Sequence, residues 1–169
     1  MISIHPAREG DAAILTAIGL RAWENATSAI GVTEELRDNA RHAFGNFAQS
    51  SWQSITVAAL DGAFVGWAAR ENFDNQISDF WIDPSYQRRG IGAVLLQDIE
   101  RQIIGRGFET AKLESHAQND QAVSFFRKHG YGVSWLSLKY SVKLDRDVQS
   151  IGLQKQLVET VRDSYGFGF

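Results

Sequence analysis

The sequence predicts a single domain of the α/β (α+β) class, in which a mixed sheet is flanked by helices. Apolar residues alternate in some segments and recur at helical spacing in others, in the order β-α-α-β-β-β-α-β-α-β. Consecutive strands indicate hairpins, and the helices between later strands indicate crossover connections. The length of 169 residues and the hydrophobic fraction of 44% suit one domain with a core of ordinary size.

A strand, two helices and a hairpin are expected in the first part of the chain. Asp11 and Thr33 are suitable N-cap residues, because their side-chain oxygens accept hydrogen bonds from the free amides of a first helical turn. Asp61-Gly62 is typical of a two-residue hairpin turn. The elements expected here are a strand at 2–4, a helix after Asp11, a helix at 33–47 and strands at 55–60 and 63–70.

The second part of the chain alternates strands with helices. The strand expected at 77–82 leads into a helix that begins after Gly90 and ends near Gly105, since glycine often follows a last helical turn. Asn119 or Asp120 is expected to cap the next helix. That helix ends at Gly130, and further strands are expected at 110–115 and 133–144.

Residues 1–144 are therefore expected to form the domain, and residues 145–169 a C-terminal extension. Leu153, Leu157 and Val161 recur at helical spacing, which suits a short amphipathic helix. We expect this helix to dock on its own domain or on a partner subunit, because exposed apolar residues favour association.

Composition excludes several classes of function. The formal net charge of −3 argues against a nucleic-acid partner. No apolar run approaches the ~20 residues that span a bilayer, and the first residues lack the blocks of a secretory signal. The absence of cysteine excludes disulfides, thiolate metal sites and a cysteine nucleophile. We therefore expect a cytoplasmic protein without a membrane, nucleic-acid or metal partner.

A basic turn with two glycines is the most informative stretch of the chain. Gly90 and Gly92 lack a Cβ, so the backbone can bend sharply and approach a ligand closely. The first amides of the helix that follows have no intrahelical partner and attract anions, and two arginines add positive charge. A phosphate-binding turn is therefore predicted at Gln87, Arg88, Arg89, Gly90, Ile91, Gly92 and Ala93.

A second motif makes this pattern more specific. Its residues are Leu113, Glu114, Asn119, Ala122, Phe125, Phe126, Gly130 and Tyr131. Together with residues 83–92, these positions resemble the GCN5-related N-acetyltransferase superfamily, and the resemblance covers about residues 1–144. A dinucleotide-binding unit fits less well, because Leu95 stands where its third glycine would be and the preceding strand comes from a hairpin.

The resemblance implies a fold, a donor and an acceptor. Members have a mostly antiparallel sheet, here of six to seven strands, and move the acetyl group of acetyl-CoA to an amine. The chain is thus expected to be an N-acetyltransferase that acts directly on a primary amine of a small molecule or peptide, with a homodimer as one arrangement. The matching cofactor-site residues are Trp81, Ile82 and Asp83 beside the pantetheine arm, Arg88, Arg89, Gly90, Ile91, Gly92 and Ala93 at the pyrophosphate, and Asn119 and Phe126 on the next helix.

The resemblance also implies candidates for the general base. Glu114 matches the glutamate that acts as base in ribosomal-protein N-terminal acetyltransferases, and His116 is a further candidate. Asp79 lies on the strand where other members place the base. It is expected to face the opposite side unless a bulge re-aims it.

The proton donor for the leaving thiolate departs from the family pattern. Many members carry a tyrosine where this chain has Phe126, which cannot donate a proton. Tyr131, Tyr86 or water is then the candidate acid, or the thiolate leaves unprotonated. The missing tyrosine prompts an alternative function, an acyl-CoA-binding protein of the same fold with little or no catalysis.

The resemblance places the acceptor between the first helices and the later strands. There Trp23, Phe44, Phe47 and Phe73 could form an apolar wall, and Glu24 could attract a cationic amine. Core packing explains each of these aromatic residues equally well.

Overall fold

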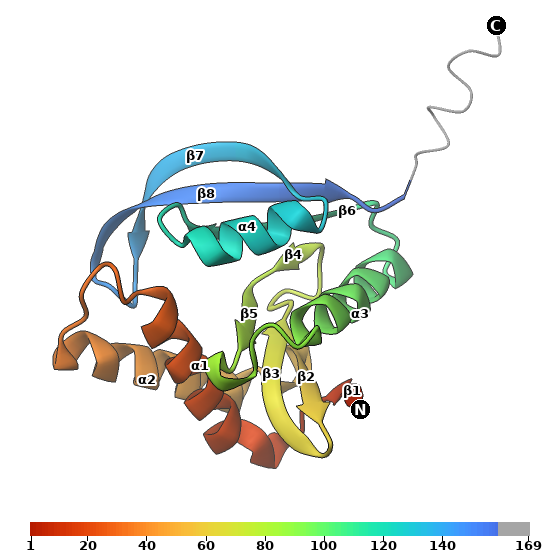
Figure 1. The fold of residues 1–169 in the computed structure, drawn as a ribbon, viewed down its shortest axis with the longest axis horizontal. Coiled ribbons are helices and arrows are strands. Elements are labelled where there is room, and N and C mark those ends of the chain that lie inside the picture. Colours follow the sequence, from red (N-terminus) through yellow and green to blue (C-terminus); the bar gives the residue numbers. More distant parts are fainter. Residues whose placement is uncertain (159–169) are drawn as a thin grey trace, which may run out of the picture.

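The strands form two open four-stranded sheets that meet at one break in the chain (Figure 1). A computed structural model describes residues 1–158. The strands are β1 (Ile2–Pro6), β2 (Ile55–Leu60), β3 (Ala63–Ala69), β4 (Gln76–Ile77), β5 (Asp79–Ile82), β6 (Thr110–His116), β7 (Gly132–Ser141) and β8 (Arg146–Gln156). The α-helices are α1 (Ala12–Ala26), α2 (Glu34–Ser50), α3 (Ile91–Gly105) and α4 (Asp120–Lys128), and short 3-10 helices are η1 (Glu9–Asp11), η2 (Trp52–Ser54) and η3 (Pro84–Tyr86).

The strand order confirms the expected mixed, mostly antiparallel sheet arrangement with flanking helices. The first sheet has the order β1-β2-β3-β5, with antiparallel neighbours throughout. The second has the order β4-β6-β8-β7, in which β4 and β6 are parallel and the other neighbours antiparallel. β4 belongs to one sheet and β5 to the other, so the two sheets diverge directly after β4.

The fourth predicted strand is interrupted at Ser78, which separates β4 from β5. Ile77 packs in the same core as Phe80, although in an unbroken strand residues three apart point to opposite faces. The extra residue acts as a bulge and reverses the alternation. Asp79 and Trp81 therefore share the face opposite to Ile77, and the Trp81 ring packs in the other core.

Separate hydrophobic cores form on the two sides of the sheets. α1 and α2 cover one side, where Trp23 and Phe44 pack with Trp67 of β3. α3 and α4 cover the other side, where Ile99 and Phe126 lie in a second cluster with residues of β6 and β8. Burial of these apolar side chains fixes the helices against the sheets, and the break at Ser78 lies between the two cores.

The structure of the C-terminal segment differs from the helix expected at 145–169 and from the domain end expected at residue 144. Over its described part it forms β8, which lies between β6 and β7 and pairs antiparallel with both (Figure 1). Leu153 is fully buried in the core under α3 and α4. Ladder hydrogen bonds on both edges thus outweigh the helical spacing of Leu153 and Leu157. The domain continues through Gln156, and Val161 lies outside the described residues.

Two further observations concern residues 1–158 alone. None of their helices is both long enough and apolar enough to span a bilayer. Their histidines and carboxylates do not gather in groups of three or more that could hold a metal ion.

Candidate active site

Two adjoining cavities open beside β5, where the sheets diverge. The turn-side cavity, of about 670 Å³, is lined by β5, the 86–93 turn and α4. The hairpin-side cavity, of about 560 Å³, is lined by β4, β5, β6 and the β7–β8 hairpin. The residues common to both linings are Ala26, Phe80, Trp81, Asn119, Ala122 and Phe126. The two cavities therefore adjoin along this shared wall.

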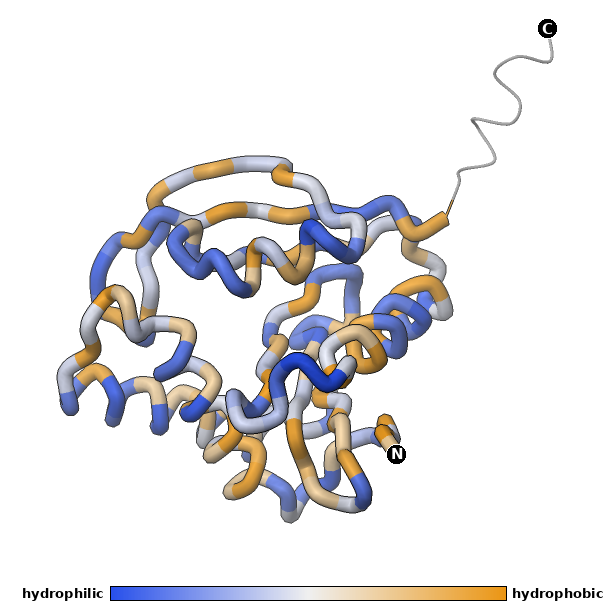
Figure 2. The backbone as a smooth tube through the Cα atoms, in the orientation of Figure 1, coloured by the Kyte–Doolittle hydropathy of each residue, from blue (hydrophilic) through white to orange (hydrophobic). Residues whose placement is uncertain are grey.

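The turn before α3 has the geometry of an anion site. Gly90 adopts a left-handed conformation (φ 78°) at the N-cap of α3. Because glycine has no side chain, this residue offers no oxygen to accept hydrogen bonds from the first amides of the helix. Arg88 is also left-handed (φ 65°) and lines the turn-side cavity. Figure 2 shows this turn as a deeply hydrophilic stretch at the start of α3. Positive side-chain charge and free helix amides therefore point to the same space.

Gly92 is required for close packing of α3 on α4. A Cβ on Gly92 would lie 3.0 Å from a ring carbon of Phe125, which is tighter than ordinary van der Waals contact. The absent side chain thus lets the first turn of α3 approach α4 and closes one wall of the turn-side cavity.

Most of the predicted cofactor residues line the turn-side cavity, but Arg89 and Asp83 do not. The Arg89 guanidinium lies over the ring of Tyr86, 5.4 Å from its centroid. Asp83 caps η3 through a hydrogen bond from the Ser85 amide. The predicted residues that do line this cavity are Trp81, Ile82, Arg88, Gly90, Ile91, Gly92, Ala93, Asn119 and Phe126.

Asp83 holds the entry to the turn in place. Arg21 of α1 donates a hydrogen bond of 2.6 Å to its carboxylate, which is buried. Burial alone would raise the pKa of Asp83, but the hydrogen bonds from Arg21 and Ser85 outweigh it and lower the pKa. The carboxylate is therefore ionised and fixed. Its side chain therefore positions the turn.

β5 offers one free edge to the gap between the sheets. Within residues 1–158 it pairs with β3 on one side and is the last strand of its sheet. β4 pairs with β6 only at Gln76 and Ile77, so β5 and β6 lie apart beyond the break. An extended, amide-containing molecule can pair with a free strand edge as another strand would.

Asn119 and Phe126 lie where the two cavities meet. The Asn119 side chain caps α4 by accepting a hydrogen bond of 3.3 Å from the Ala122 amide. The Phe126 ring packs edge-on against Phe80, with centroids 5.3 Å apart, and is 5% exposed. The capping role of Asn119 therefore coexists with a place on both cavity walls.

The hairpin-side cavity gathers most of the ionisable side chains of the site. The β7–β8 hairpin supplies lysines and a tyrosine that sequence reasoning missed, because only the strand order brings the hairpin opposite β5. The ionisable lining residues are Glu71, Asp79, Glu114, His116, Lys139, Tyr140 and Lys143.

Glu114 and His116 both point to this cavity from β6, but their environments differ. Lys139 donates a hydrogen bond of 2.6 Å to the half-exposed Glu114 carboxylate, and its ammonium also lies over the Trp135 ring. His116 is more buried, and its Nδ1 has no hydrogen-bond partner among the described residues. Burial, together with nearby Lys143, lowers the pKa of His116.

Asp79 reaches the same cavity from β5. Its Oδ1 accepts a hydrogen bond of 3.0 Å from the Trp81 indole nitrogen. Burial raises the pKa of Asp79, although Trp81, Lys143 and Ser78 act in the opposite direction. The bulge at Ser78 has therefore re-aimed this carboxylate into the cavity.

Residues 19–131 match the model of the Acetyltransferase (GNAT) family, which spans more than half of the chain. The chain belongs to this family. The ribosomal protein bS18-alanine N-acetyltransferase of Escherichia coli K12 is 32% identical over 59 residues, which cover 35% of this chain and 40% of that enzyme. The match thus spans two-fifths of the length of that curated relative.

Solved structures of GNAT proteins share the fold. A GCN5-related N-acetyltransferase from Rhodopseudomonas palustris has a TM-score of 0.76 at 24% identity, covering 92% of this chain and 95% of that one. PaiA N-acetyltransferase from Thermoplasma acidophilum, solved in complex with coenzyme A, has a TM-score of 0.67 at 20% identity, covering 92% and 99%.

Tyr131 lies away from both cavities of this GNAT domain. Its hydroxyl donates a hydrogen bond of 2.8 Å to Glu100 on α3, which also receives the Lys155 ammonium. Burial and the Glu100 carboxylate raise the pKa of Tyr131 far above its usual value. Tyr131 is therefore not placed to donate a proton to a ligand in either cavity. Tyr86, the other tyrosine considered for this role, does line the turn-side cavity.

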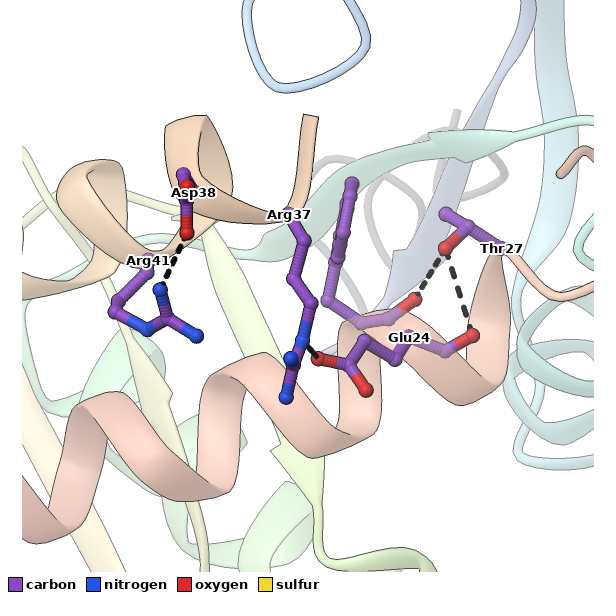
Figure 3. A network of polar contacts seen from close by, with 6 residues as sticks. Glu24, Thr27, Arg37, Asp38 and Arg41 are labelled. Atoms are coloured by element: carbon purple, nitrogen blue, oxygen red, sulfur yellow. Dashed lines mark hydrogen bonds and ion pairs between the residues drawn. The ribbon is translucent and has the colours of Figure 1, made fainter. Parts of the chain in front are cut away.

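The expected acceptor wall on α1 and α2 is mostly engaged elsewhere. Figure 3 shows Glu24 of α1 paired with Arg37 of α2, and Thr27 donating to backbone carbonyls of the preceding turn. Phe44 is a core residue between Trp67 and Trp81. Of the residues expected on this wall, Trp23 lines the hairpin-side cavity. Phe47 stacks on a core tryptophan, and Phe73 is 43% exposed beside Arg106.

Proposed function

We propose that the protein is an acetyl-CoA-dependent N-acetyltransferase that transfers acetyl directly to a primary amine of a small molecule or peptide. The observation that carries this proposal is the contact between the two cavities at Asn119 and Phe126. One cavity has the basic turn and free helix amides suited to a diphosphate, and the other has carboxylates suited to an amine. Donor and acceptor would therefore meet at the shared wall.

The turn-side cavity is proposed to hold coenzyme A. Arg88 and the first amides of α3 suit the two phosphates, because helix N-termini and cationic side chains stabilise anions. The free edge of β5 suits the amide groups of the pantetheine arm. When bound, acetyl-CoA supplies the acetyl group as a thioester.

The hairpin-side cavity is proposed to hold the acceptor and to take its proton. The amine nitrogen forms a bond to the acetyl carbon while the bond from that carbon to sulfur breaks. An alkylammonium must first lose a proton, and the cavity offers carboxylates that can accept it. The sequence contains no cysteine, which favours direct transfer over a route through an acetylated cysteine.

The proposal is tested by release of coenzyme A thiol from acetyl-CoA over a panel of primary amines. The panel includes alkylamines and a peptide with N-terminal alanine, because the bS18 enzyme is named for acetylation of alanine. We expect at least one amine to accelerate thiol release with saturation. Acetyl-CoA binding without any amine-dependent release would favour the second candidate, an acyl-CoA-binding protein, which the phenylalanine at position 126 favours.

The location and assembly of the protein are part of the same proposal. A cytoplasmic location fits the lack of cysteine and the supply of acetyl-CoA that the reaction requires. The expected homodimer stays a prediction, and the mass of the protein in solution tests it.

A further inference from the structure

We propose that Asp79, at the start of β5, is the catalytic base that takes the proton of the acceptor amine. This inference rests on the proposed acetyl transfer and assigns the base within it. The sequence motif favours Glu114 for this role, whereas the arrangement of the hairpin-side cavity favours Asp79.

The break at Ser78 determines the direction in which the Asp79 side chain points. Without the break at Ser78, Asp79 would share a face with Ile77, which is buried in the core under α3 and α4. The bulge instead puts Asp79 on the face of Trp81, where it lines the hairpin-side cavity. Asp79 is also adjacent to Phe80, which belongs to the wall shared by both cavities. The carboxylate is thus attached at the point where donor and acceptor would meet.

The Asp79 carboxylate is held by its neighbours on the same strand. Its Oδ1 accepts the hydrogen bond of 3.0 Å from the Trp81 indole, and the adjacent Ser78 also stabilises the ionised form. The Trp81 ring is itself fixed edge-on against Phe44, with centroids 5.2 Å apart. A base must be held in a fixed position within reach of the proton that it accepts, and these contacts fix the Asp79 carboxylate on the cavity wall.

The other candidate bases in this cavity are engaged differently. Glu114 is half-exposed, and its carboxylate is occupied by an ion pair with Lys139. His116 is half-buried near the Lys143 ammonium, and both effects disfavour the protonated imidazolium that a base must become. Burial instead raises the pKa of Asp79, which strengthens it as a base.

The charged surroundings of Asp79 come from several elements. The neighbours that act on its charge directly are Lys143 of the β7–β8 hairpin and Glu71 of the loop after β3. Further titratable groups on the cavity wall are Glu114 and His116 of β6 and Lys139 and Tyr140 of β7.

The proton transfer balances within the proposed reaction. The ammonium loses one proton to the carboxylate of Asp79, and the neutral amine then attacks the acetyl carbon. The carbon–sulfur bond breaks, and the thiolate takes up a proton from solvent as coenzyme A leaves. Asp79 returns its proton to water and is ionised again.

The test is the pH profile of kcat/KM for amine-dependent thiol release in the wild type and in the variants Asp79→Asn, Glu114→Gln and His116→Gln. The wild-type profile should rise with pH through the pKa of one free-enzyme base. We expect Asp79→Asn to lower kcat/KM by about 10²–10³-fold and to abolish this rise, as loss of a general base does. Glu114→Gln and His116→Gln, which change the acceptor cavity without removing the base, should lower kcat/KM by less than Asp79→Asn does and should keep the rise with pH.

Coenzyme A binding by each variant separates a catalytic loss from a folding defect. If Asp79→Asn binds coenzyme A poorly, the pH profile of Asp79→Glu is the decisive measurement. If residue 79 is the base, this variant must shift the midpoint of the rise in kcat/KM. The proposal is overturned if Asp79→Asn retains the wild-type profile, if Asp79→Glu leaves the midpoint in place, or if Glu114→Gln or His116→Gln abolishes the rise. A wild type that releases no thiol with any amine refutes the proposed function itself, which is a distinct result.

Discussion

The guanidinium of Arg21 on α1 donates to the buried carboxylate of Asp83 across 2.6 Å, where β5 enters the basic turn. This contact ties the helical layer of α1 and α2 to the turn that is proposed to hold the diphosphate. The same carboxylate caps η3 through the Ser85 amide. The entry to the turn is therefore held both by α1 and by its own backbone.

Arg21→Gln should destabilise the protein by about 1–2 kcal/mol at pH 7, because it leaves a buried carboxylate without its cation, while the half-exposed arginine limits the loss. The pKa of Asp83 is lowered in the folded state, so the stabilisation is present above the unfolded pKa and is lost as pH falls through the folded pKa. Urea unfolding at pH 7 and below about pH 4 should show the difference between the proteins shrinking. Arg41→Gln, which breaks an exposed pair with Asp38, should cost less than about 0.5 kcal/mol.

Gly92→Ala should weaken coenzyme A binding by about fivefold and destabilise the domain by about 1 kcal/mol. The new Cβ would lie 3.0 Å from the Phe125 ring, so α3 or α4 must shift and the turn-side cavity must change shape. Calorimetric titration and thermal melting measure the two effects. Gly105→Ala is the control, since it has open space and should leave binding unchanged. Wild-type affinity in Gly92→Ala would contradict the proposed place of the diphosphate.

Phe126→Tyr should raise kcat for amine-dependent thiol release by up to about tenfold, less than the about 10²–10⁴ of an evolved general acid. The added hydroxyl would stand where the two cavities meet, within reach of a departing thiolate. Phe125→Tyr adds a hydroxyl on the same helix but lines the turn-side cavity alone, and it should leave kcat unchanged. An equal effect of both variants would show that position 126 has no special access to the leaving group.

Tyr131→Phe should destabilise the protein by about 1 kcal/mol without changing kcat, because it removes one hydrogen bond to Glu100 outside both cavities. Glu100 keeps the Lys155 ammonium as a partner, which limits the loss. The pKa of Tyr131 is raised in the folded state, so its contribution is full below about pH 10 and is lost at higher pH. Unfolding curves and steady-state rates measured together check this, and a fall in kcat would restore Tyr131 as a candidate acid.

Asp79→Asn should stabilise the protein at pH 7 and raise its Tm by about 2–4 °C, the change expected for about 1 kcal/mol in a domain of this length. Burial raises the pKa of Asp79, so the ionised carboxylate costs stability above its folded pKa, and this cost disappears as pH falls toward the unfolded value near about 4. The Tm gain should therefore vanish at low pH. Asp98→Asn, on the α3 surface, serves as a matched control. A lower Tm for Asp79→Asn at pH 7 would contradict this prediction and would show that the ionised carboxylate stabilises the folded protein.

Local sequence patterns are sufficient to predict where several helices and turns of this protein begin. Cap residues such as Thr33 and Asn119 place the starts of helices, because capping depends on hydrogen bonds between near neighbours in the chain. The basic turn at Gly90 is likewise a local feature, since a left-handed residue before a helix needs only glycine chemistry. Together with the second motif, these patterns predict the family, and the match of residues 19–131 to the family model confirms the prediction.

Only the tertiary structure decided which side chains share a cavity and how the chain ends. β8 is a strand because β6 and β7 supply hydrogen bonds on both its edges, and partners that lie distant in sequence leave no trace in the spacing of Leu153 and Leu157. One extra residue at Ser78 turns Asp79 to the other face, a reversal that alternation cannot reveal until the strand's partners are known. Local backbone chemistry thus fixed the helices and the turn, whereas long-range pairing fixed the strand register and with it the lining of the candidate active site.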